Sequence, residues 1–324
     1  MYLEIPKIIN TRPKSNKYIL DESLKKAVEV AMTFNQPLLL TGEPGTGKTL
    51  LAYKVADMLH QQTKDATNGQ LKFAEEPLRF NTKTSSIARD LFYIYDAIGH
   101  FQHANIKTED ATNKKSVKEF IELQAIGKAI ALANPKAAYD SLFKWEMPDY
   151  PQSSVVLVDE IDKAPRDFTN DILNEIERQE FFIKEQDNQR LALGENNTQR
   201  ILTIMTSNSE KNLPDAFLRR CVFYHISFPS SEKLLQILKA QLENTDSEFI
   251  NKNLSAITDL FDKVRKAAIR KKPATAELVA FVKLMEMENH LTDKNPNVKE
   301  WFLNNLSLLA KSKEDIEAIS KVLK

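Results

Sequence analysis

One short stretch of this chain combines glycines, a lysine and a threonine at a spacing suited to holding phosphate. It reads Gly42-Glu43-Pro44-Gly45-Thr46-Gly47-Lys48-Thr49 and contains three of the chain's seven glycines. Backbone N–H groups can wrap a phosphate only where no side chain blocks their approach, and this segment has the P-loop spacing. A glycine-rich turn with a purely structural role would not require Lys-Thr at this offset. The sequence therefore predicts a bound nucleoside triphosphate.

Two side chains of this stretch have specific chemical tasks. Lys48 is expected to reach the β- and γ-phosphates, and the Thr49 hydroxyl is expected to ligate Mg²⁺. The residues after Lys48 have a helical pattern, and the N-terminus of that helix adds a favourable dipole to the same anion site. ATP and Mg²⁺ are therefore the predicted cofactors.

Two adjacent carboxylates follow a buried strand. The apolar run Val155–Val158 leads directly into Asp159 and Glu160, at the strand end where open α/β folds bind ligands. Asp159 is expected to hold Mg²⁺, through water or with Thr49, and Glu160 to orient and deprotonate the attacking water. An acidic strand end in a solvated turn is the alternative, which the upstream P-loop makes less favoured.

The full set of predicted ligands follows from these two motifs. The predicted metal ligands are Thr49 and Asp159. The predicted nucleotide-binding residues are Gly42, Glu43, Pro44, Gly45, Thr46, Gly47, Lys48, Thr49, Leu50 and Asp159.

An asparagine and two arginines further along complete the candidates. Asn208 follows the apolar run Ile201–Met205, so its amide can contact the γ-phosphate or the attacking water, although asparagine also caps turns. Arg219 and Arg220 follow a short helical pattern. A guanidinium supplied by a neighbouring subunit can stabilise the charge on a transferring phosphoryl group, whereas an isolated arginine pair is usually surface charge. Glu160, Asn208, Arg220 and Arg219 are the predicted catalytic residues.

The elements that position these residues alternate between strands and helices. This alternation predicts a three-layer α/β fold with a mostly parallel sheet. Beyond residue 229 the apolar spacing is helical throughout, so we expect an αβα domain over residues 1–229 and a smaller all-α lid over 230–324. The predicted strands are Pro37–Thr41, Leu78–Phe80, Val155–Val158, Ile201–Met205 and Val222–Ile226.

Smaller elements are predicted from local patterns. Asp21 is a plausible N-cap for a helix over 21–34, and one helix is expected after Pro165. Phe181–Ile183 and Arg190–Leu193 are expected to pair across a polar turn. In the lid, Ser312 with Asp315 approximates a capping box, and Ile316, Ile319 and Val322 are expected on one helix face.

Residues 82–152 form an insert that does not fit one simple helix. Leu91–Tyr95 and His100–Gln102 flank a glycine-containing turn, which predicts a β-hairpin, with a helix as a close alternative for so short a run. A polar loop is expected over 105–115 and a helix over 117–132. The aromatic residues of the insert suit either its own core or contact with a partner.

Composition limits the possible classes of protein. Lys and Arg total 45 and so do Asp and Glu, so no overall field favours nucleic acid or an anionic membrane. The single cysteine, Cys221, excludes an intrachain disulfide and suits a reducing compartment. No apolar run is long enough to cross a bilayer, and the N-terminal residues do not form a secretory signal. We therefore expect a cytoplasmic protein without membrane insertion.

Taken in order along the chain, these motifs resemble those of AAA+ ATPases. Residues 158–165, Val-Asp-Glu-Ile-Asp-Lys-Ala-Pro, resemble in particular the MoxR-like branch, and the resemblance covers residues 18–324. It implies that Gly42–Thr49 is the Walker A motif, that Asp159 and Glu160 form Walker B and that Asn208 is the first sensor. It also implies an arginine finger, at Arg220 or alternatively Arg219.

The same resemblance implies an assembly and a task. Such proteins form homo-oligomeric rings, usually hexamers, in which ATP lies between an αβα domain and a helical lid. They remodel or activate a protein client, often one with a von Willebrand factor A domain. A nucleic-acid translocase or loader, an ATP-gated assembly switch with little turnover and, least favoured, a small-molecule kinase are the other functions considered.

Two departures, in the second sensor and in the length of the stretch Asn81–Gln152, and one weaker match accompany the resemblance. The MoxR-like branch carries an inserted hairpin, and Leu91–Gln102 lies where it is expected. The Ser-Pro-Arg-type second sensor is replaced by Lys271–Thr275, so Arg270 or Lys272 is the candidate for that role. The run Lys263–Lys272 has six basic residues in ten and is expected to form a solvated lid face or a subunit contact rather than a nucleic-acid site. Asn81 is the candidate to restrain the catalytic glutamate.

Overall fold

The computed structural model describes residues 14–67, 69–105, 116–139, 142–143, 147–194, 197–208, 213–242, 248–292 and 297–324. Its contacts group the chain into two compact units. The sheet unit comprises Leu20–Thr41 and Leu51–His225, and the helical unit comprises Met1–Ile19, Gly42–Leu50 and Ile226–Lys324. The domain boundary near residue 229 stays a prediction.

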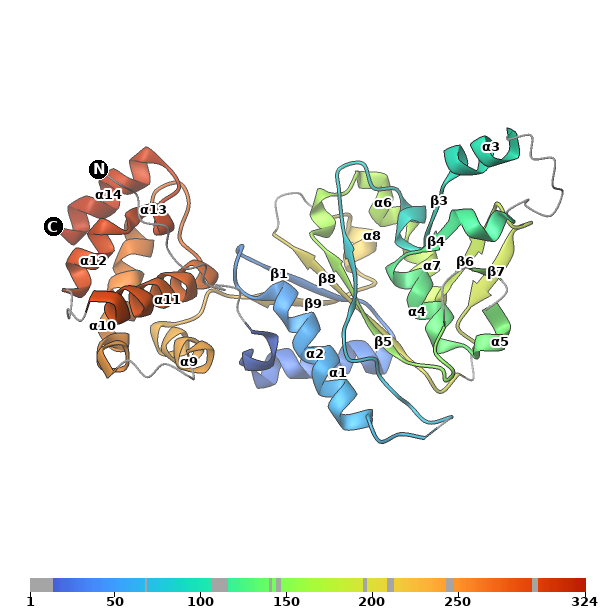
Figure 1. Cartoon of the computed structure of the whole chain (residues 1–324), viewed down its shortest axis with the longest axis horizontal. Helices are drawn as coiled ribbons and strands as arrows, with labels where there is room; N and C mark the ends of the chain where they lie inside the picture. The colour runs from blue at the N-terminus through green and yellow to red at the C-terminus, as the bar shows by residue number, and fades with distance from the viewer. Residues whose placement is uncertain are drawn as a thin grey trace. The chain divides into compact units, whose positions relative to one another are not determined.

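A five-stranded sheet in the order β2-β5-β8-β1-β9 organises the sheet unit (Figure 1). The pairs β2/β5, β5/β8 and β1/β8 are all parallel. Every residue of β1, β5 and β8 is buried, as continuous apolar runs in a parallel sheet predict. The α/β class with a mostly parallel sheet is therefore confirmed. The strands are β1 (Leu38–Gly42), β2 (Leu78–Asn81), β5 (Ser154–Asp159), β8 (Ile201–Ser207) and β9 (Val222–Ile226).

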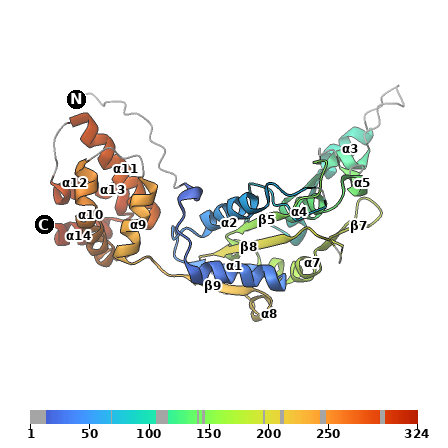
Figure 2. The same cartoon turned by 90° about the horizontal axis from the view of Figure 1, so that it is seen from below.

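Helices cover both faces of this sheet, as Figure 2 shows with α2 and α4 on one face and α1 and α7 on the other. The predicted first helix is α1 (Glu22–Phe34), and it ends at Asn35, which adopts a left-handed conformation. Asp21 occupies the N-cap position, where its backbone oxygen accepts the Lys25 N–H at 2.8 Å. The others are α2 (Lys48–Thr63), α4 (Ala125–Ala133) and α7 (Leu173–Arg178).

The predicted hairpin of the insert is wrong. β3 (Tyr93–Tyr95) pairs antiparallel with β4 (Ile121–Leu123), and the residues after β3 form helix α3 (Ala97–Asn105). The physical reason lies at Asp96, whose Oδ1 accepts the Gly99 N–H at 2.8 Å. This bond starts a helix where the sequence pattern indicated a turn between strands. The loop predicted over 105–115 lies almost wholly outside the described residues.

The helix predicted over 117–132 divides into three elements. A 3-10 turn, Val117–Phe120, is followed by β4 and then by α4. Ile121 and Leu123 are buried and Glu122 between them is exposed, which is the alternation of a strand with one covered face. Phe92 and Tyr93 lie in the core, whereas Phe101 on α3 is 71% exposed. The aromatic residues of the insert are therefore divided between its core and its surface, and contact with a partner stays a prediction.

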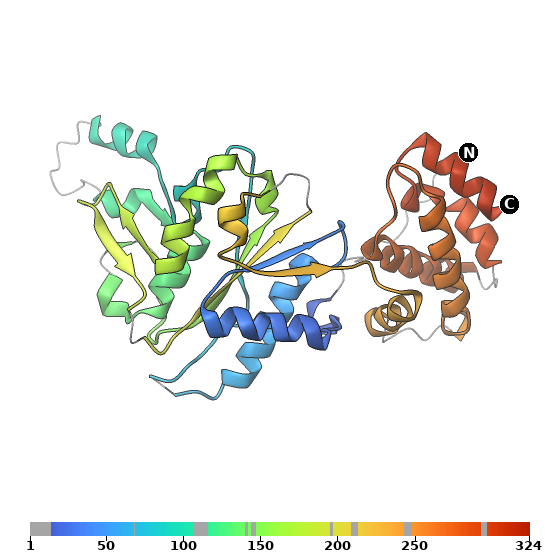
Figure 3. The same ribbon diagram turned by 180° about the vertical axis from the view of Figure 1, so that it is seen from behind.

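The segment after β5 agrees with its prediction except for one break. The expected single helix is α6 (Arg166–Asp171) followed by α7 (Leu173–Arg178), with an interruption at Ile172. The apolar residues expected on one face of that helix are nevertheless buried, namely Phe168, Ile172, Leu173 and Ile176. The hairpin that follows is confirmed, with β6 (Glu180–Ile183) antiparallel to β7 (Gln189–Ala192) (Figure 3).

The helical unit has helices throughout its described part beyond β9, as predicted. Its core is built from large aromatic residues, including Phe261, Phe281, Trp301 and Phe302, which are all buried. The helices of this unit beyond β9 are α9 (Ser231–Gln241), α10 (Glu248–Ala267), α11 (Thr275–Thr292), α12 (Val298–Asn304), α13 (Leu306–Leu309) and α14 (Lys313–Leu323). A short 3-10 turn, Ser15–Lys17, precedes the sheet in the chain.

Helix α14 differs from its prediction in two respects. Ile316 and Val322 are exposed, and the buried face instead carries Asp315, Ile319 and Leu323. Ser312 caps the helix by accepting the Asp315 N–H at 3.1 Å. The Asp315 carboxylate accepts N–H groups of the loop after α10 instead, from residues 269, 270 and 271. Those backbone hydrogen bonds, the one from Arg270 foremost, lower the pKa of Asp315.

One member of the basic run is not on a solvated face. Arg265 is buried, its guanidinium lies 3.4 Å from the ring centroid of Phe228, and it donates to the Pro273 carbonyl at 2.6 Å. It also pairs with Glu43, which belongs to the same unit. Arg270 is largely exposed and pairs with Glu314 at 3.1 Å. The expected solvated face therefore holds for Arg270 but not for Arg265.

Candidate functional site

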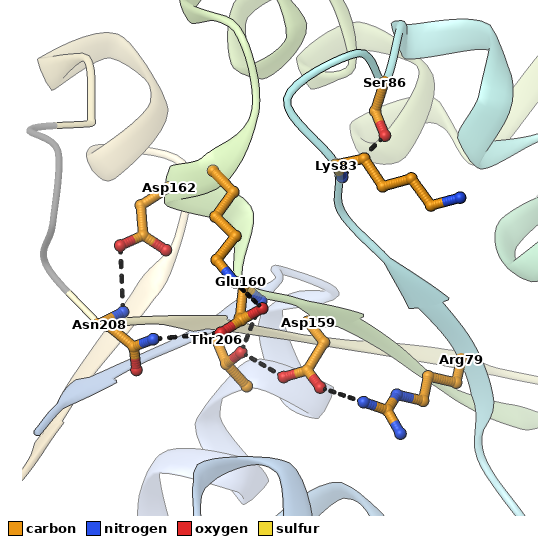
Figure 4. Close-up of polar contacts among 9 residues, drawn as sticks. Arg79, Lys83, Ser86, Asp159, Glu160, Asp162, Thr206 and Asn208 are labelled. Atoms are coloured by element: carbon orange, nitrogen blue, oxygen red, sulfur yellow. Dashed lines mark hydrogen bonds and ion pairs between the residues drawn. The ribbon is translucent and has the colours of Figure 1, made fainter. Parts of the chain in front are cut away.

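Four parallel strands of the sheet unit end at one edge. The paired positions there are Asn81 with Asp159 and Thr41 with Ser207, and Val158 pairs with Met205 in between. Because parallel strands present their carboxyl ends together, the register itself assembles the side chains that follow β5 and β8. Asp159 and Glu160 therefore meet Asn208, which is distant in sequence, at this edge (Figure 4).

Asp159 is buried at the end of β5 and both of its carboxylate oxygens are engaged. Oδ1 accepts the Thr206 hydroxyl at 2.7 Å, and Oδ2 pairs with the Arg79 guanidinium at 2.7 Å. Figure 4 shows the three side chains in a row across β8, β5 and β2. Such bonds fix the orientation of a carboxylate before any ligand arrives, because its rotation would break both of them.

Glu160 has an unusual backbone conformation. Its φ of 58° and ψ of 51° place it in the left-handed region, which is uncommon for a residue with a side chain. The turn is stabilised where the Glu160 N–H donates to the Thr206 hydroxyl oxygen at 2.9 Å. Thr206 therefore holds both acidic residues, by donating to Asp159 and accepting from Glu160.

The Glu160 carboxylate is held by two neighbours. Lys163 Nζ lies 2.5 Å from Oε2, and the Asn208 amide donates to Oε1 at 3.3 Å. Asn208 is itself fixed by its backbone N–H, which donates to Asp162 Oδ2 at 3.2 Å. Asn81 was expected to provide the restraint. It is exposed at the neighbouring strand end, and the contacts to Glu160 come from Lys163 and Asn208.

The phosphate-binding candidate is the loop that directly follows β1, within the helical unit. Lys48 is buried, and its Nζ donates to the carbonyls of Gly42 at 2.7 Å and Glu43 at 2.9 Å. Gly47 has φ of 92°, which favours glycine, and a Cβ there would lie 2.8 Å from the Tyr18 ring. The loop conformation therefore depends on the absence of a side chain at this position.

The two arginines lie at the other end of the sheet. They follow α8 (Asp215–Leu218), and the next residue but one, Val222, donates its N–H to the Pro37 carbonyl at 2.9 Å. At the far end Thr41 contacts His225 at 3.0 Å, so β9 runs in the same direction as β1. Arg219 and Arg220 are consequently at the amino edge, separated from the carboxyl edge by the five residues of β1, or about 16 Å of strand.

Arg220 makes only peripheral contacts at that edge. Its Nε lies 3.4 Å from Glu177 Oε2, and its Nη1 donates to the Ala216 carbonyl at 3.3 Å. Both Arg219 and Arg220 are exposed. The structure thus brings Asp159, Glu160 and Asn208 together and keeps the arginines of the same chain away from them.

Three residues of the site were not expected from the sequence: Arg79, Lys163 and Thr206. Thr206 could have been recognised, because it stands two residues before Asn208 on a strand that ends there. Arg79 and Lys163 depend on strand register and on the turn at Glu160, and neither has a local sequence signal.

The donor atoms of the predicted metal ligands suit magnesium. Mg²⁺ takes oxygen ligands, uses one or two protein carboxylates and completes its shell with water and substrate phosphates. A carboxylate from Asp159 and a hydroxyl from Thr49 match that chemistry. Among the described residues there is no cluster of three or more His, Cys, Asp or Glu that could hold a metal ion.

Comparison with known proteins identifies the family. Residues 38–230 match the model of the ATPase family associated with various cellular activities (AAA), which is more than half of the chain. The chain belongs to the AAA family. The match extends from β1 to the residue before α9 and thus contains the strands, the loop after β1 and every candidate catalytic residue.

Solved structures similar to this AAA protein were also found. Domain III of the replication initiation protein DnaA from Thermotoga maritima is 11% identical, covers 92% of this chain and 97% of its own, and has a TM-score of 0.48. The FIGL-1 AAA domain in complex with ADP is 18% identical over 93% and 86%, with a TM-score of 0.45. A RuvB variant from Thermotoga maritima is 14% identical over 91% and 70%, with a TM-score of 0.47.

At these identities and TM-scores the likenesses carry no argument about function. A search of curated protein sequences found no significant match. In the part of the chain that the structure describes, no helix has both the length and the apolar character needed to span a bilayer.

Proposed function

We propose that this AAA protein is a MoxR-like ATPase that hydrolyses Mg²⁺-bound ATP in a ring of identical subunits and uses the energy to remodel or activate a protein client. The observation that carries the proposal is the arrangement of the sheet unit. Its carboxyl edge gathers an oriented carboxylate pair and an asparagine, while Arg220 lies at the opposite edge of the same sheet.

Each candidate residue has a task in the proposed hydrolysis. Gly42–Leu50 binds the phosphates, with Lys48 as the positive charge on the β- and γ-phosphates. Glu160 orients a water molecule and accepts its proton as the oxygen attacks the γ-phosphorus, and Asn208 aligns that water or the γ-phosphate. Asp159 and Thr49 would hold Mg²⁺, which, when bound, neutralises charge on the phosphates.

Glu160 must leave Lys163 to act. Its carboxylate is an effective base for water only when it is not paired with the ammonium, which lies 2.5 Å from Oε2. The pair is partly exposed on both sides, so its separation has a modest energetic cost. This resting contact also favours a second candidate function, an ATP-gated assembly switch with little turnover.

The position of Arg220 supports an active site shared between subunits. About 16 Å of strand lies between it and the carboxyl edge of its own sheet, which is beyond the reach of an arginine side chain. We therefore assign Arg220, or alternatively Arg219, to the γ-phosphate of a neighbouring subunit, where a guanidinium stabilises the transferring group. A closed, homo-oligomeric ring, in this family usually a hexamer, satisfies every such site.

The remaining assignments belong to the same proposal. The helical region after residue 229 acts as the lid, with Arg270 or Lys272 as second sensor. The insert offers a client surface, because Ile98 and Phe101 on α3 are each 71% exposed, which is unusual for large apolar residues on one short helix. We propose a protein client, of the kind that carries a von Willebrand factor A domain, and a cytoplasmic location.

The test is the steady-state ATPase rate per subunit, measured with Mg²⁺ over a wide range of protein concentrations. We expect the rate per subunit to rise steeply with concentration and then reach a plateau, in parallel with assembly followed by analytical ultracentrifugation. A concentration-independent rate from monomers would overturn the shared site. Tight ATP binding and assembly without turnover would favour the switch.

A further inference from the structure

The carboxylate proposed to hold Mg²⁺ already has a cation beside it. The Asp159 side chain is 8% exposed, and Arg79 Nη2 lies 2.7 Å from its Oδ2 (Figure 4). A buried carboxylate is costly unless a charge or hydrogen bonds compensate it. Arg79 provides that charge in the structure, and the Thr206 hydroxyl satisfies the other oxygen.

The contact follows from the register of two strands. Arg79 on β2 is paired with Leu157 on β5. Residues 157 and 159 point to the same face of the sheet, because side chains alternate along a strand. Arg79 and Asp159 are therefore diagonal neighbours on one face, at a separation that long side chains bridge. The pair is built into the sheet and does not depend on a loop.

Two cations would use the same carboxylate. The Arg79 side chain is 42% exposed, so it can move into solvent without becoming an unpaired buried charge. A hard divalent cation competes well for a carboxylate oxygen, because it combines a double charge with short oxygen contacts. With Arg79 present, the site has a neutral pair before the metal arrives and an exposed guanidinium afterwards.

We propose that Arg79 is an exchangeable counter-ion for Asp159. It neutralises the carboxylate while no metal is bound, gives way when Mg²⁺ and ATP arrive together, and thereby sets how strongly ATP binding depends on Mg²⁺. Arg79 is a positioning residue that acts through Asp159. The inference rests on the proposed function, since it requires Asp159 to lie in the site for Mg²⁺ and nucleotide.

Removal of Arg79 has two effects of opposite sign. Without metal, an uncompensated Asp159 repels the phosphates, so ATP binds more weakly. With metal, Mg²⁺ no longer competes with the guanidinium, so its contribution to ATP binding grows. The ratio of the ATP dissociation constant without Mg²⁺ to that with Mg²⁺ should therefore rise by about fivefold in Arg79→Met, which corresponds to the upper end of the range for a partly exposed ion pair.

The experiment measures ATP affinity by calorimetry in EDTA and in saturating Mg²⁺, and Mn²⁺ affinity by electron paramagnetic resonance. Arg89→Met is the matched control, because Arg89 makes a similar ion pair with Glu185 at 3.3 Å and is 40% exposed, away from Asp159. We expect the ratio and the Mn²⁺ affinity to rise in Arg79→Met, to stay near the wild-type values in Arg89→Met, and to be largely restored in Arg79→Lys.

A second pair of variants tests whether the effect passes through Asp159. Adding Arg79→Met to Asp159→Asn should leave the ratio unchanged, because the neutral side chain has no need of a counter-ion. Three outcomes would each overturn the inference. The ratio of dissociation constants could stay unchanged in Arg79→Met, or it could change as much in Arg89→Met as in Arg79→Met. It could also rise as much when Arg79→Met is added to Asp159→Asn as when it is added to the wild type.

The measurement also separates this inference from the proposed function. If the wild-type protein fails to bind ATP, or if Lys48→Ala binds it as tightly as the wild type does, the proposed function fails and the counter-ion role fails with it. If ATP binding depends on Lys48 but the ratio is insensitive to Arg79, the counter-ion role alone is wrong. Melting temperatures near that of the wild type establish that the variants are folded.

Discussion

The two edges of the central sheet differ sharply in how their charged residues are held. At the carboxyl edge, Asp159 and Glu160 are fixed by short bonds to Arg79, Thr206 and Lys163. At the amino edge, Arg220 is exposed and has an ion pair of 3.4 Å with Glu177. The two Thr206 bonds, which the proposed chemistry does not break, preorganise both acidic residues within one chain. A group that must meet a second subunit is better left accessible, and the contrast between the edges is what a shared site requires.

The largest effect is expected from Lys48→Ala, in the loop that follows the carboxyl end of β1. The variant lacks the ammonium that would otherwise neutralise the β- and γ-phosphates. We expect ATP binding to become undetectable at micromolar concentrations in a calorimetric titration. Retained micromolar affinity would mean that this loop is not the phosphate site, and the comparison of the two edges would lose its basis.

The next effect tests the amino edge. Arg220→Ala should bind ATP with wild-type affinity, because the arginine does not belong to the site of its own chain. Turnover should fall by about 10³-fold or more, as for other arginines that stabilise a transferring phosphoryl group. The assay is steady-state phosphate release at a concentration where the protein is assembled.

Arg219→Ala is the matched control for this variant, since the two arginines are adjacent and both exposed. We expect it to retain most of its activity. If Arg219→Ala is the inactive variant and Arg220→Ala is not, the finger is Arg219, and the comparison of the edges still holds with the other arginine.

Glu160→Gln should leave ATP binding intact and lower turnover by about 10²-fold or more, since the amide cannot accept the proton of the attacking water. We expect the assembled, ATP-bound state to accumulate, which sizing in the presence of ATP would detect. Undiminished phosphate release would remove Glu160 as the base and would leave the oriented cluster at the carboxyl edge without its proposed chemistry.

A mixture of the two inactive variants sharpens the comparison. Glu160→Gln subunits supply Arg220, and Arg220→Ala subunits supply Glu160, so a mixed ring has some complete sites. Random assembly of equal amounts should restore about a quarter of the wild-type activity, because each site takes its two residues from different subunits. If the two residues acted within one chain, the mixture would be as inactive as either variant alone.

The parts of this arrangement that could be predicted are those with a local signal. β5 and β8 are continuous apolar runs, and their ends carry Asp159 and Asn208, so both the strands and the clustering follow from the sequence. The glycine pattern between Gly42 and Lys48 is equally local. The sequence did not predict the interruption between α6 and α7. This error leaves the predicted packing unchanged, because the expected apolar residues of both helices are buried.

What could not be predicted depends on contacts between distant segments. β3 resembles one strand of a local hairpin, but its partner β4 lies beyond α3 and the residues that follow it. The Arg79–Asp159 pair requires the register between β2 and β5, and Ile316 and Val322 are exposed because the core side of α14 is set by the helices around it. In each case the residues were visible in the sequence but their neighbours were not.

The last prediction concerns Cys221, the residue after Arg220. Burial raises the pKa of its thiol to about 12. Because only the thiolate reacts, the reactive fraction at pH 8 is about 10³-fold below that of a thiol with a pKa of about 9. We expect iodoacetamide to label native Cys221 slowly at pH 8 and to label the protein quickly in denaturant, as followed by mass spectrometry.

The labelling rate bears on how Arg220 is presented to a neighbour. Slow labelling would mean that the start of β9 stays packed beside Pro37, so the arginine is offered from a fixed backbone and only its side chain is free. Fast labelling of the native protein would mean that this edge opens on the timescale of the experiment. The orientation of Arg220 would then have to be set by the neighbouring subunit. The two edges would in that case differ in the mobility of their backbone as well as in how their side chains are held.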